Sequence, residues 1–321
     1  MRNFGLRADF DLHAMTKNQS LSGLSQAILK PLDRLLEKIS PDCVLVQGDT
    51  TTAFLVALAA FYRKIPVGHV EAGLRTDDRY QPFPEEINRR LITQVAEFHF
   101  APTRLSFHRL VQEGVEKRNI VRSGNTGIDA LLLMKEQLSR RKKPPLLLPP
   151  RRKIILVTAH RRESFGDPLA RICGAIKKIS SLVPDSEIYY PVHLNPNVQA
   201  MVKKQLGGHP RIHLIKPLAY DQLVYLMMRA DLILTDSGGI QEEAPSFHKP
   251  ILVLRNVTER PEGVRAGFSV VVGQNTQSIV REARRILEKT DRTQKLRKIQ
   301  NPYGDGKAAA RIIRFLEKRL A

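Results

Sequence analysis

Nine short apolar segments alternate along the chain with longer stretches of helical periodicity, and this alternation limits the fold more than any other feature. The segments are residues 44–46, 65–70, 98–101, 154–157, 188–192, 212–215, 232–234, 251–254 and 269–272. Strands that alternate with helices are typical of βαβ units with a parallel sheet. Nine strands are too many for one small sheet, and 321 residues exceed the usual size of one domain. We therefore expect an α/β protein of two parallel-sheet domains with a site in the cleft between them.

The boundary between these domains is expected in the segment 140–153, where basic residues and prolines flank three leucines. Proline fixes φ and removes an N–H donor, and like charges repel one another, so neither a helix nor a central strand is expected there. The first domain is then predicted to span residues 1–143, and the second begins at residue 151.

The net charge of +20 raises the question of a polyanionic partner, such as nucleic acid or an anionic membrane surface. The basic residues are spread through helix-like stretches and the linker, without a nucleic-acid motif, so most of this charge is interpreted as a solvated surface. No apolar run approaches the ~20 residues that span a bilayer, and no signal-like segment follows Met1. Cys43 and Cys173 have no metal-ligating neighbours at useful spacing. We expect a cytoplasmic protein that binds no metal, no nucleic acid and no membrane.

Polar side chains follow five of the predicted strands, at the point where each strand ends. They are Asp49, Glu71, His160, His193 and the segment 236–239. In open parallel sheets ligands bind at this edge. The sequence therefore predicts that chemistry is concentrated at the carboxyl ends of the strands.

Each of these groups also has a simpler interpretation. The run Asp-Ser-Gly-Gly at 236–239 suits a phosphate because glycine lets backbone N–H groups approach an anion, but Asp and Ser are also ordinary helix caps. His160 begins a polar cluster with two arginines that suits an anion, or a solvated loop. Arg260 is a further candidate anion ligand, and His193 is equally well a packed histidine.

Three acidic positions in the first half suggest proton transfer, which commonly uses paired carboxylates in different surroundings. They are Asp49, Glu71 and the pair 85–86. A cap or a surface acid explains each one alone. Glu71 is the exception, because Gly73 and Arg75 follow it in a loop that suits close approach to an anion.

Nine segments taken together resemble the non-hydrolysing UDP-N-acetylglucosamine 2-epimerases in order and spacing. They are residues 48–52, 69–76, 84–89, 124–126, 160–166, 191–197, 236–245, 258–262 and 301–306. The resemblance covers nearly all of residues 41–320. It implies a glycosyltransferase-B fold of two Rossmann-like domains, with 151–300 as the UDP-binding domain and 301–321 as a helix that crosses back to the first domain.

The resemblance also implies the reaction and the residues that carry it. UDP-N-acetylglucosamine and UDP-N-acetylmannosamine interconvert through elimination and re-addition of UDP, without a cofactor, in an enzyme that serves cell-surface polysaccharide synthesis and tends to form homodimers. The family's catalytic groups correspond to Asp49, Glu71, Glu85 and His160. Its UDP ligands correspond to Ser237, Gly239, Glu243 and Arg260, and part of its activator site to Arg162, Glu163 and His193.

The chain departs from the family pattern at its start. Family members begin with a strand and a Gly-Thr-Arg-Pro-Glu loop, whereas here residues 9–12 resemble the family's third strand. From this we expect a first domain that lacks inner strands, which leaves unpaired ladder groups. Two alternatives to the leading hypothesis stay open: a hydrolysing epimerase of the same fold, which releases free N-acetylmannosamine, and a UDP-sugar-binding protein without activity.

Overall fold

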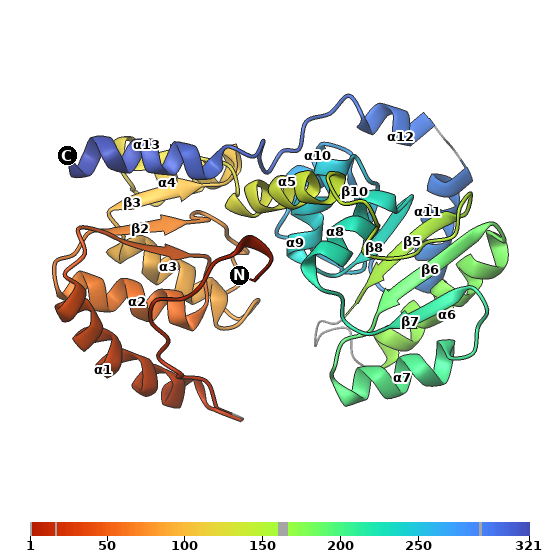
Figure 1. The fold of residues 1–321 in the computed structure, drawn as a ribbon, viewed down its shortest axis with the longest axis horizontal. Helices are drawn as coiled ribbons and strands as arrows, with labels where there is room; N and C mark the ends of the chain where they lie inside the picture. The colour runs from red at the N-terminus through yellow and green to blue at the C-terminus, as the bar shows by residue number, and fades with distance from the viewer. Residues whose placement is uncertain (1, 17, 160–165, 289–290) are drawn as a thin grey trace. The chain divides into compact units, whose positions relative to one another are not determined.

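The computed structural model describes residues 2–16, 18–159, 166–288 and 291–321 (Figure 1). It divides into two compact units. Unit 1 comprises Met1–Asp129 and Tyr303–Ala321, and unit 2 comprises Ala130–Pro302. Each unit is built on one parallel sheet, which confirms the predicted α/β class.

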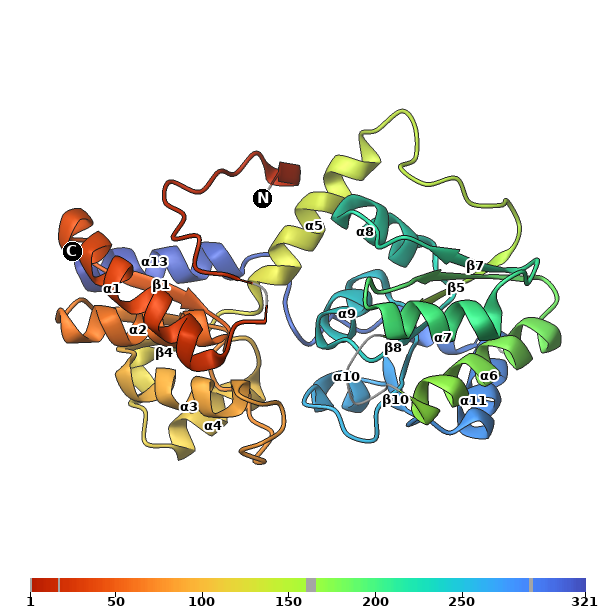
Figure 2. The same ribbon diagram turned by 90° about the horizontal axis from the view of Figure 1, so that it is seen from below.

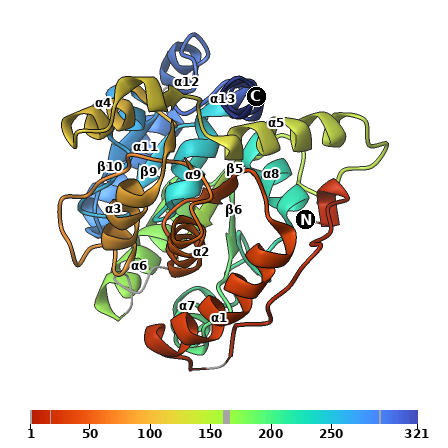
Figure 3. The same ribbon diagram turned by 90° about the vertical axis from the view of Figure 1, so that its left-hand side faces the viewer.

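Unit 1 contains a four-stranded sheet in the order β1-β2-β3-β4. The strands are β1 (Val44–Gln47), β2 (Val67–Val70), β3 (Phe98–Ala101) and β4 (Ile120–Arg122). Its helices are α1 (Leu21–Ile39), α2 (Thr51–Tyr62), α3 (Glu85–Val95), α4 (Arg104–Gln112) and α13 (Ala308–Leu320). Figure 3 views this unit with α1, α2 and α3 towards the reader. The central strands β2 and β3 are buried throughout, as expected for parallel strands covered on both faces.

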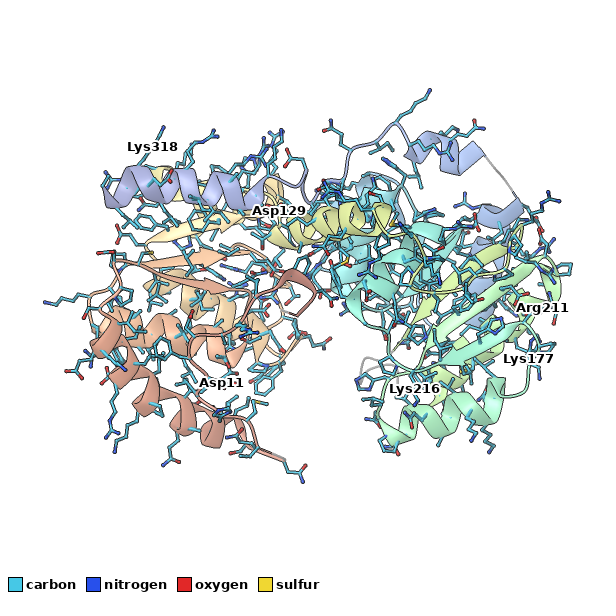
Figure 4. The ribbon with its side chains drawn as sticks, viewed as in Figure 1. Asp11, Asp129, Lys177, Arg211, Lys216 and Lys318 are labelled. Atoms are coloured by element: carbon cyan, nitrogen blue, oxygen red, sulfur yellow. The ribbon has the colours of Figure 1, made fainter. Side chains whose placement is uncertain are left out.

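Helix α13 covers one face of this sheet, and α1, α2 and α3 lie on the opposite side (Figure 1). The Phe315 ring packs edge-on against Phe98 and Phe100, with ring centroids 5.5 and 5.8 Å apart. At the start of α13, the N–H groups of Ala308 and Ala309 donate to the Asp129 carboxylate at 3.1 and 2.8 Å (Figure 4). These contacts bring the last residues of the chain into the core of unit 1.

Unit 2 contains a six-stranded sheet in the order β10-β9-β8-β5-β6-β7. The strands are β5 (Lys153–Thr158), β6 (Ser186–Pro191), β7 (Ile212–Ile215), β8 (Leu232–Thr235), β9 (Ile251–Val253) and β10 (Ser269–Val271). The helices are α6 (Asp167–Leu182), α7 (Pro196–Leu206), α8 (Tyr220–Arg229), α9 (Gly238–Glu243), α10 (Pro261–Arg265), α11 (Thr276–Glu288) and α12 (Asp291–Leu296). Helices α6 and α11 lie side by side and bury apolar stripes in the core of this unit (Figure 2).

Helix α5 (Thr126–Ser139) contains the point at which the two units divide, between Asp129 and Ala130. Of the predicted linker 140–153, residues 140–152 form neither helix nor strand, and Lys153 begins β5. Among the described residues, no helix has the length and apolar character needed to cross a membrane.

All nine apolar segments overlap strands of the structure, which confirms the predicted alternation. The strand β4 was not predicted. Residues 9–12 form no strand, so the likeness of this segment to the family's third strand does not extend to its conformation here.

Candidate functional site

Asp49 and Glu71 lie just past the carboxyl ends of the adjacent strands β1 and β2 of unit 1. Both turns use left-handed backbone, with φ of 73° at Gly48 and 69° at Glu71. A glutamate in this region is strained, and such strain is concentrated at functional sites. A Cβ added to Gly48 would lie 3.5 Å from Glu71 Oε2, so the Glu71 side chain reaches back over the neighbouring turn.

Helix α3 completes this edge of unit 1. Its first residue is Glu85, whose Oε2 atom is buried and has no hydrogen-bond partner among the described residues. One turn later, Arg89 Nη2 donates to Asp49 Oδ2 at 2.5 Å, and Asn88 Nδ2 donates to the Asp49 backbone oxygen at 2.9 Å. The three predicted catalytic carboxylates of Asp49, Glu71 and Glu85 therefore belong to one rim, in three different environments.

Glu86, the second member of the acidic pair, has a structural role. Its side chain is completely buried, and its Oε2 accepts from both the backbone N–H and the hydroxyl of Thr76 at 3.0 Å. Its Oε1 accepts from Arg90 Nε at 2.9 Å. These contacts anchor the loop after Glu71 to α3, which leaves Glu85 as the member of the pair available for chemistry.

The expectation that Arg75 serves an anion is wrong. Arg75 is 2% exposed, and its guanidinium forms two hydrogen bonds with the Glu113 carboxylate, at 2.7 and 2.6 Å. A third bond, at 2.9 Å, goes to Thr93 Oγ1. Because a buried charge is costly unless it is paired, this side chain is committed to holding the loop against α3 and α4.

The loop after β8 forms the corresponding rim of unit 2. Ser237 precedes α9, Gly239 lies in its first turn, and Glu243 is its last residue. The hydroxyl of Thr235 accepts from the Ser237 N–H at 3.0 Å and lies 2.6 Å from the hydroxyl of Thr158 on β5. The Ser237 loop is thereby tied to two strands of the sheet.

Arg260 packs against this loop. A Cβ at Gly238 would lie 3.2 to 3.4 Å from atoms of its guanidinium, so a side chain at this position would require the guanidinium to shift. Arg260 Nε donates to Glu242 Oε1 at 2.8 Å, and its Nη1 lies 3.2 Å from Glu259 Oε1. The two carboxylates orient the guanidinium of Arg260, a residue that is 9% exposed.

Glu243 is a titratable group of this rim, and its carboxyl is largely removed from water. Burial, together with the nearby charge of Glu242, raises its pKa to about 7, although a hydrogen bond from Tyr220 opposes this shift. Tyr220 Oη donates to Glu243 Oε1 at 3.5 Å. The structure thus brings all four predicted UDP ligands, Ser237, Gly239, Glu243 and Arg260, to one edge of unit 2.

Several predicted residues are not part of either rim as described. His160, Arg162 and Glu163 lie outside the described residues. His193 follows β6 and is exposed, and its Nδ1 accepts from the Asn195 N–H at 3.2 Å. Asn88 and Tyr220 were not predicted from the sequence. Asn88 lies one turn after Glu85 in α3, and Tyr220 is the first residue of α8, and neither position is a strong signal of a functional residue.

Comparisons with known proteins concern the family and the fold of the chain. The family model for UDP-N-acetylglucosamine 2-epimerase matches residues 1–317. The UDP-N-acetylglucosamine 2-epimerase of Escherichia coli K12 is 48% identical over 324 residues, which cover 99% of this chain and 86% of that protein. The Campylobacter jejuni enzyme of the same name is 48% identical over 325 residues, with 98% and 85% covered.

Solved structures extend the likeness to the fold. The Neisseria meningitidis UDP-GlcNAc 2-epimerase bound to UDP-GlcNAc is 44% identical, with a TM-score of 0.93 over 98% of this chain and 86% of that one. The Methanocaldococcus jannaschii epimerase in complex with UDP-GlcNAc and UDP is 33% identical, with a TM-score of 0.85 over 99% and 86%. These likenesses confirm the expected glycosyltransferase-B type of fold. The chain belongs to the UDP-N-acetylglucosamine 2-epimerase family.

Proposed function

We propose that this protein is a non-hydrolysing epimerase that interconverts UDP-N-acetylglucosamine and UDP-N-acetylmannosamine. Family membership and the names of relatives at 45–48% identity support this activity. The observation that carries the proposal is the set of three carboxylates on the unit 1 rim, Asp49, Glu71 and Glu85, each held in a different environment. Groups in different environments are what proton removal and proton return require.

In the proposed reaction a carboxylate removes the proton from C2 of the sugar while the bond between C1 and the UDP oxygen breaks. The products of this step are 2-acetamidoglucal and UDP. The UDP oxygen then adds back to C1, and a proton returns to C2 on the opposite face. Elimination and re-addition together leave the oxidation state of the sugar unchanged, so the proposed reaction needs no cofactor. We assign Asp49, Glu71 and Glu85 to the proton transfers and His160 to the diphosphate.

The departing UDP must be held until it re-adds, and we assign this task to the unit 2 rim. The Ser237 hydroxyl and the Gly239 amide are proposed phosphate ligands, together with Arg260. Because Glu242 and Glu259 already orient the Arg260 guanidinium, phosphate binding requires little further ordering of that side chain. Glu243 is assigned to the ribose hydroxyls, which donate to a carboxylate.

Product analysis tests this function. Purified protein is incubated with UDP-N-acetylglucosamine, and the sugars are separated by anion-exchange chromatography. The proposal predicts a second UDP-linked sugar, UDP-N-acetylmannosamine, in equilibrium with the first. Free N-acetylmannosamine and UDP as the main products indicate the hydrolysing alternative, and UDP binding without any product indicates a protein that only binds UDP-sugars.

Further features are proposed from the family resemblance. The protein is proposed to act as a homodimer in the cytoplasm, in the synthesis of cell-surface polysaccharide. Arg162, Glu163 and His193 are proposed to form part of an activator site for a second UDP-N-acetylglucosamine molecule. Measuring turnover against substrate concentration tests this site, because activation by a second substrate molecule gives a sigmoidal curve. His193→Ala should make that curve closer to hyperbolic.

A further inference from the structure

We propose that His69 and Asn88 are positioning residues, which hold the Gly48–Asp49 turn so that the Asp49 carboxylate keeps a fixed place beside Glu71. This inference rests on the proposed epimerase function and adds two residues to it. Neither side chain is assigned a contact with the substrate. Their role is to fix the backbone from which Asp49 acts.

His69 lies in the middle of the sheet of unit 1, paired in register with Val46 on β1 and with His99 on β3. Its side chain is completely buried, and burial lowers its pKa to about 3, so the ring is neutral and carries one N–H. The Nε2 atom lies 2.9 Å from the backbone oxygen of Gly48, whereas Nδ1 has no hydrogen-bond partner among the described residues. A carbonyl oxygen only accepts, so the network assigns the proton to Nε2, which donates to Gly48.

The His69 bond is the second of two hydrogen bonds that connect the turn after β1 with the strand β2. The Gly48 N–H already donates to the Val70 oxygen at 3.0 Å. Gly48 is therefore bonded to β2 through both its N–H and its carbonyl, and its φ of 73° directs the chain into Asp49. Because β2 leads directly into Glu71, these two bonds fix the spacing between the Asp49 turn and the Glu71 backbone.

Asn88 holds the next peptide group from the side of α3. Its Nδ2 donates to the Asp49 backbone oxygen at 2.9 Å and lies 3.4 Å from Thr51 Oγ1. Asn88 is 6% exposed, so water competes little for these bonds. Consecutive carbonyls, of Gly48 and of Asp49, are thus each held by a neutral side-chain donor, whereas Arg89 holds the Asp49 carboxylate itself.

His99 provides a matched comparison within the same sheet. It is 2% exposed, and burial lowers its pKa to about 4, so it is a second neutral, buried histidine beside His69. The described hydrogen bonds do not join it to the Gly48–Asp49 turn. Replacing His99 therefore reports the cost of losing a buried histidine, and replacing His69 reports that cost together with the loss of positioning.

The test compares His69→Leu, His69→Gln, Asn88→Leu and His99→Leu. Leucine removes the donor at similar volume, and the glutamine amide can donate from nearly the same place as Nε2. Because a displacement of about 1 Å can reduce turnover by about 100-fold, we expect His69→Leu and Asn88→Leu to lower kcat about 10- to 100-fold. UDP affinity should change by less than about twofold, since the proposed UDP ligands lie on unit 2. His69→Gln should recover most of the lost kcat, and His99→Leu should keep the kcat of the unmodified protein.

Hydrogen exchange of residues 48–53 supplies a readout that does not depend on turnover. We expect faster exchange in His69→Leu and Asn88→Leu than in His99→Leu. Unchanged exchange in both leucine variants overturns the proposal, as does an equal loss of kcat in His69→Leu and His99→Leu. If His69→Leu does not fold, the positioning role is tested by comparing the kcat and the hydrogen exchange of His69→Gln and Asn88→Leu with those of His99→Leu. An unmodified protein that gives no epimer contradicts the proposed function, while the exchange experiment still tests the positioning role.

Discussion

Replacing Glu243 by glutamine is expected to change how the stability of unit 2 depends on pH. The Glu243 carboxyl is partly buried at the end of α9, beside Glu242, and its pKa is raised from 4.5 to about 7. The folded protein therefore binds more protons than the unfolded chain between about pH 4.5 and pH 7. Stability must then fall as the pH rises through this window, because the charged carboxylate is favoured in the unfolded chain.

The size of this effect follows from the shift. One pKa unit corresponds to about 1.4 kcal/mol, so the rise from 4.5 to about 7 amounts to a loss on the order of 3 kcal/mol between pH 5 and pH 8. Glutamine is neutral throughout and has nearly the same shape. Relative to the unmodified protein, Glu243→Gln should therefore gain stability as the pH rises, with most of the gain appearing between pH 5 and pH 8.

Urea unfolding at pH 5, 6, 7 and 8, followed by circular dichroism, measures this difference. Glu288→Gln removes an exposed carboxylate on α11 and controls for the change in net charge. A constant difference in unfolding free energy between Glu243→Gln and the unmodified protein at all four pH values would refute the assignment of a titrating, buried carboxyl at this position.

The remaining predictions concern catalysis, binding and packing. Glu71→Gln should lower kcat by about 10²- to 10⁴-fold while UDP still binds in calorimetry, and a near-normal rate removes Glu71 from the mechanism. Arg260→Ala should weaken UDP binding about 10- to 150-fold, since a charged hydrogen bond contributes about 1.5 to 3 kcal/mol, and unchanged affinity rules out that contact. Phe315→Ala should destabilise unit 1 by about 2 to 3 kcal/mol in thermal unfolding, whereas the exposed Ile313→Ala should stay within about 0.5 kcal/mol. Equal losses for these two helix variants contradict the packing assigned to α13.

Much of the fold was predictable because parallel strands buried on both faces appear in the sequence as continuous apolar runs. The strand β4 escaped this rule, since Ile120-Val121-Arg122 offers only two apolar residues and its pairing with β3 makes it a strand. The proposed domain limits of 143, 151 and 300 remain predictions.

The candidate site was predictable only in part. Strand ends and the family resemblance indicated Asp49, Glu71 and Glu85, but not the different roles of Glu85 and Glu86. That distinction depends on Thr76 and Arg90, which contact only one of the two side chains. Pairings between residues far apart in the chain are not visible in a single sequence.

Arg75 illustrates the same limit, because its partner Glu113 lies 38 residues away, and in the sequence its loop position suggested an anion ligand. The bond from His69 to a backbone oxygen is equally invisible, since every residue has a carbonyl. Such contacts depend on tertiary structure, and only the folded chain reveals which backbone atoms are held.

The most direct test of the central claim is the epimerisation of UDP-N-acetylglucosamine in D₂O, followed by proton NMR. Removal of the C2 proton by a carboxylate that exchanges with solvent predicts UDP-N-acetylmannosamine with deuterium at C2, and loss of the C2 proton signal from the product. No UDP-linked epimer after long incubation with a protein that binds UDP would contradict the account. So would an epimer that retains the original hydrogen at C2.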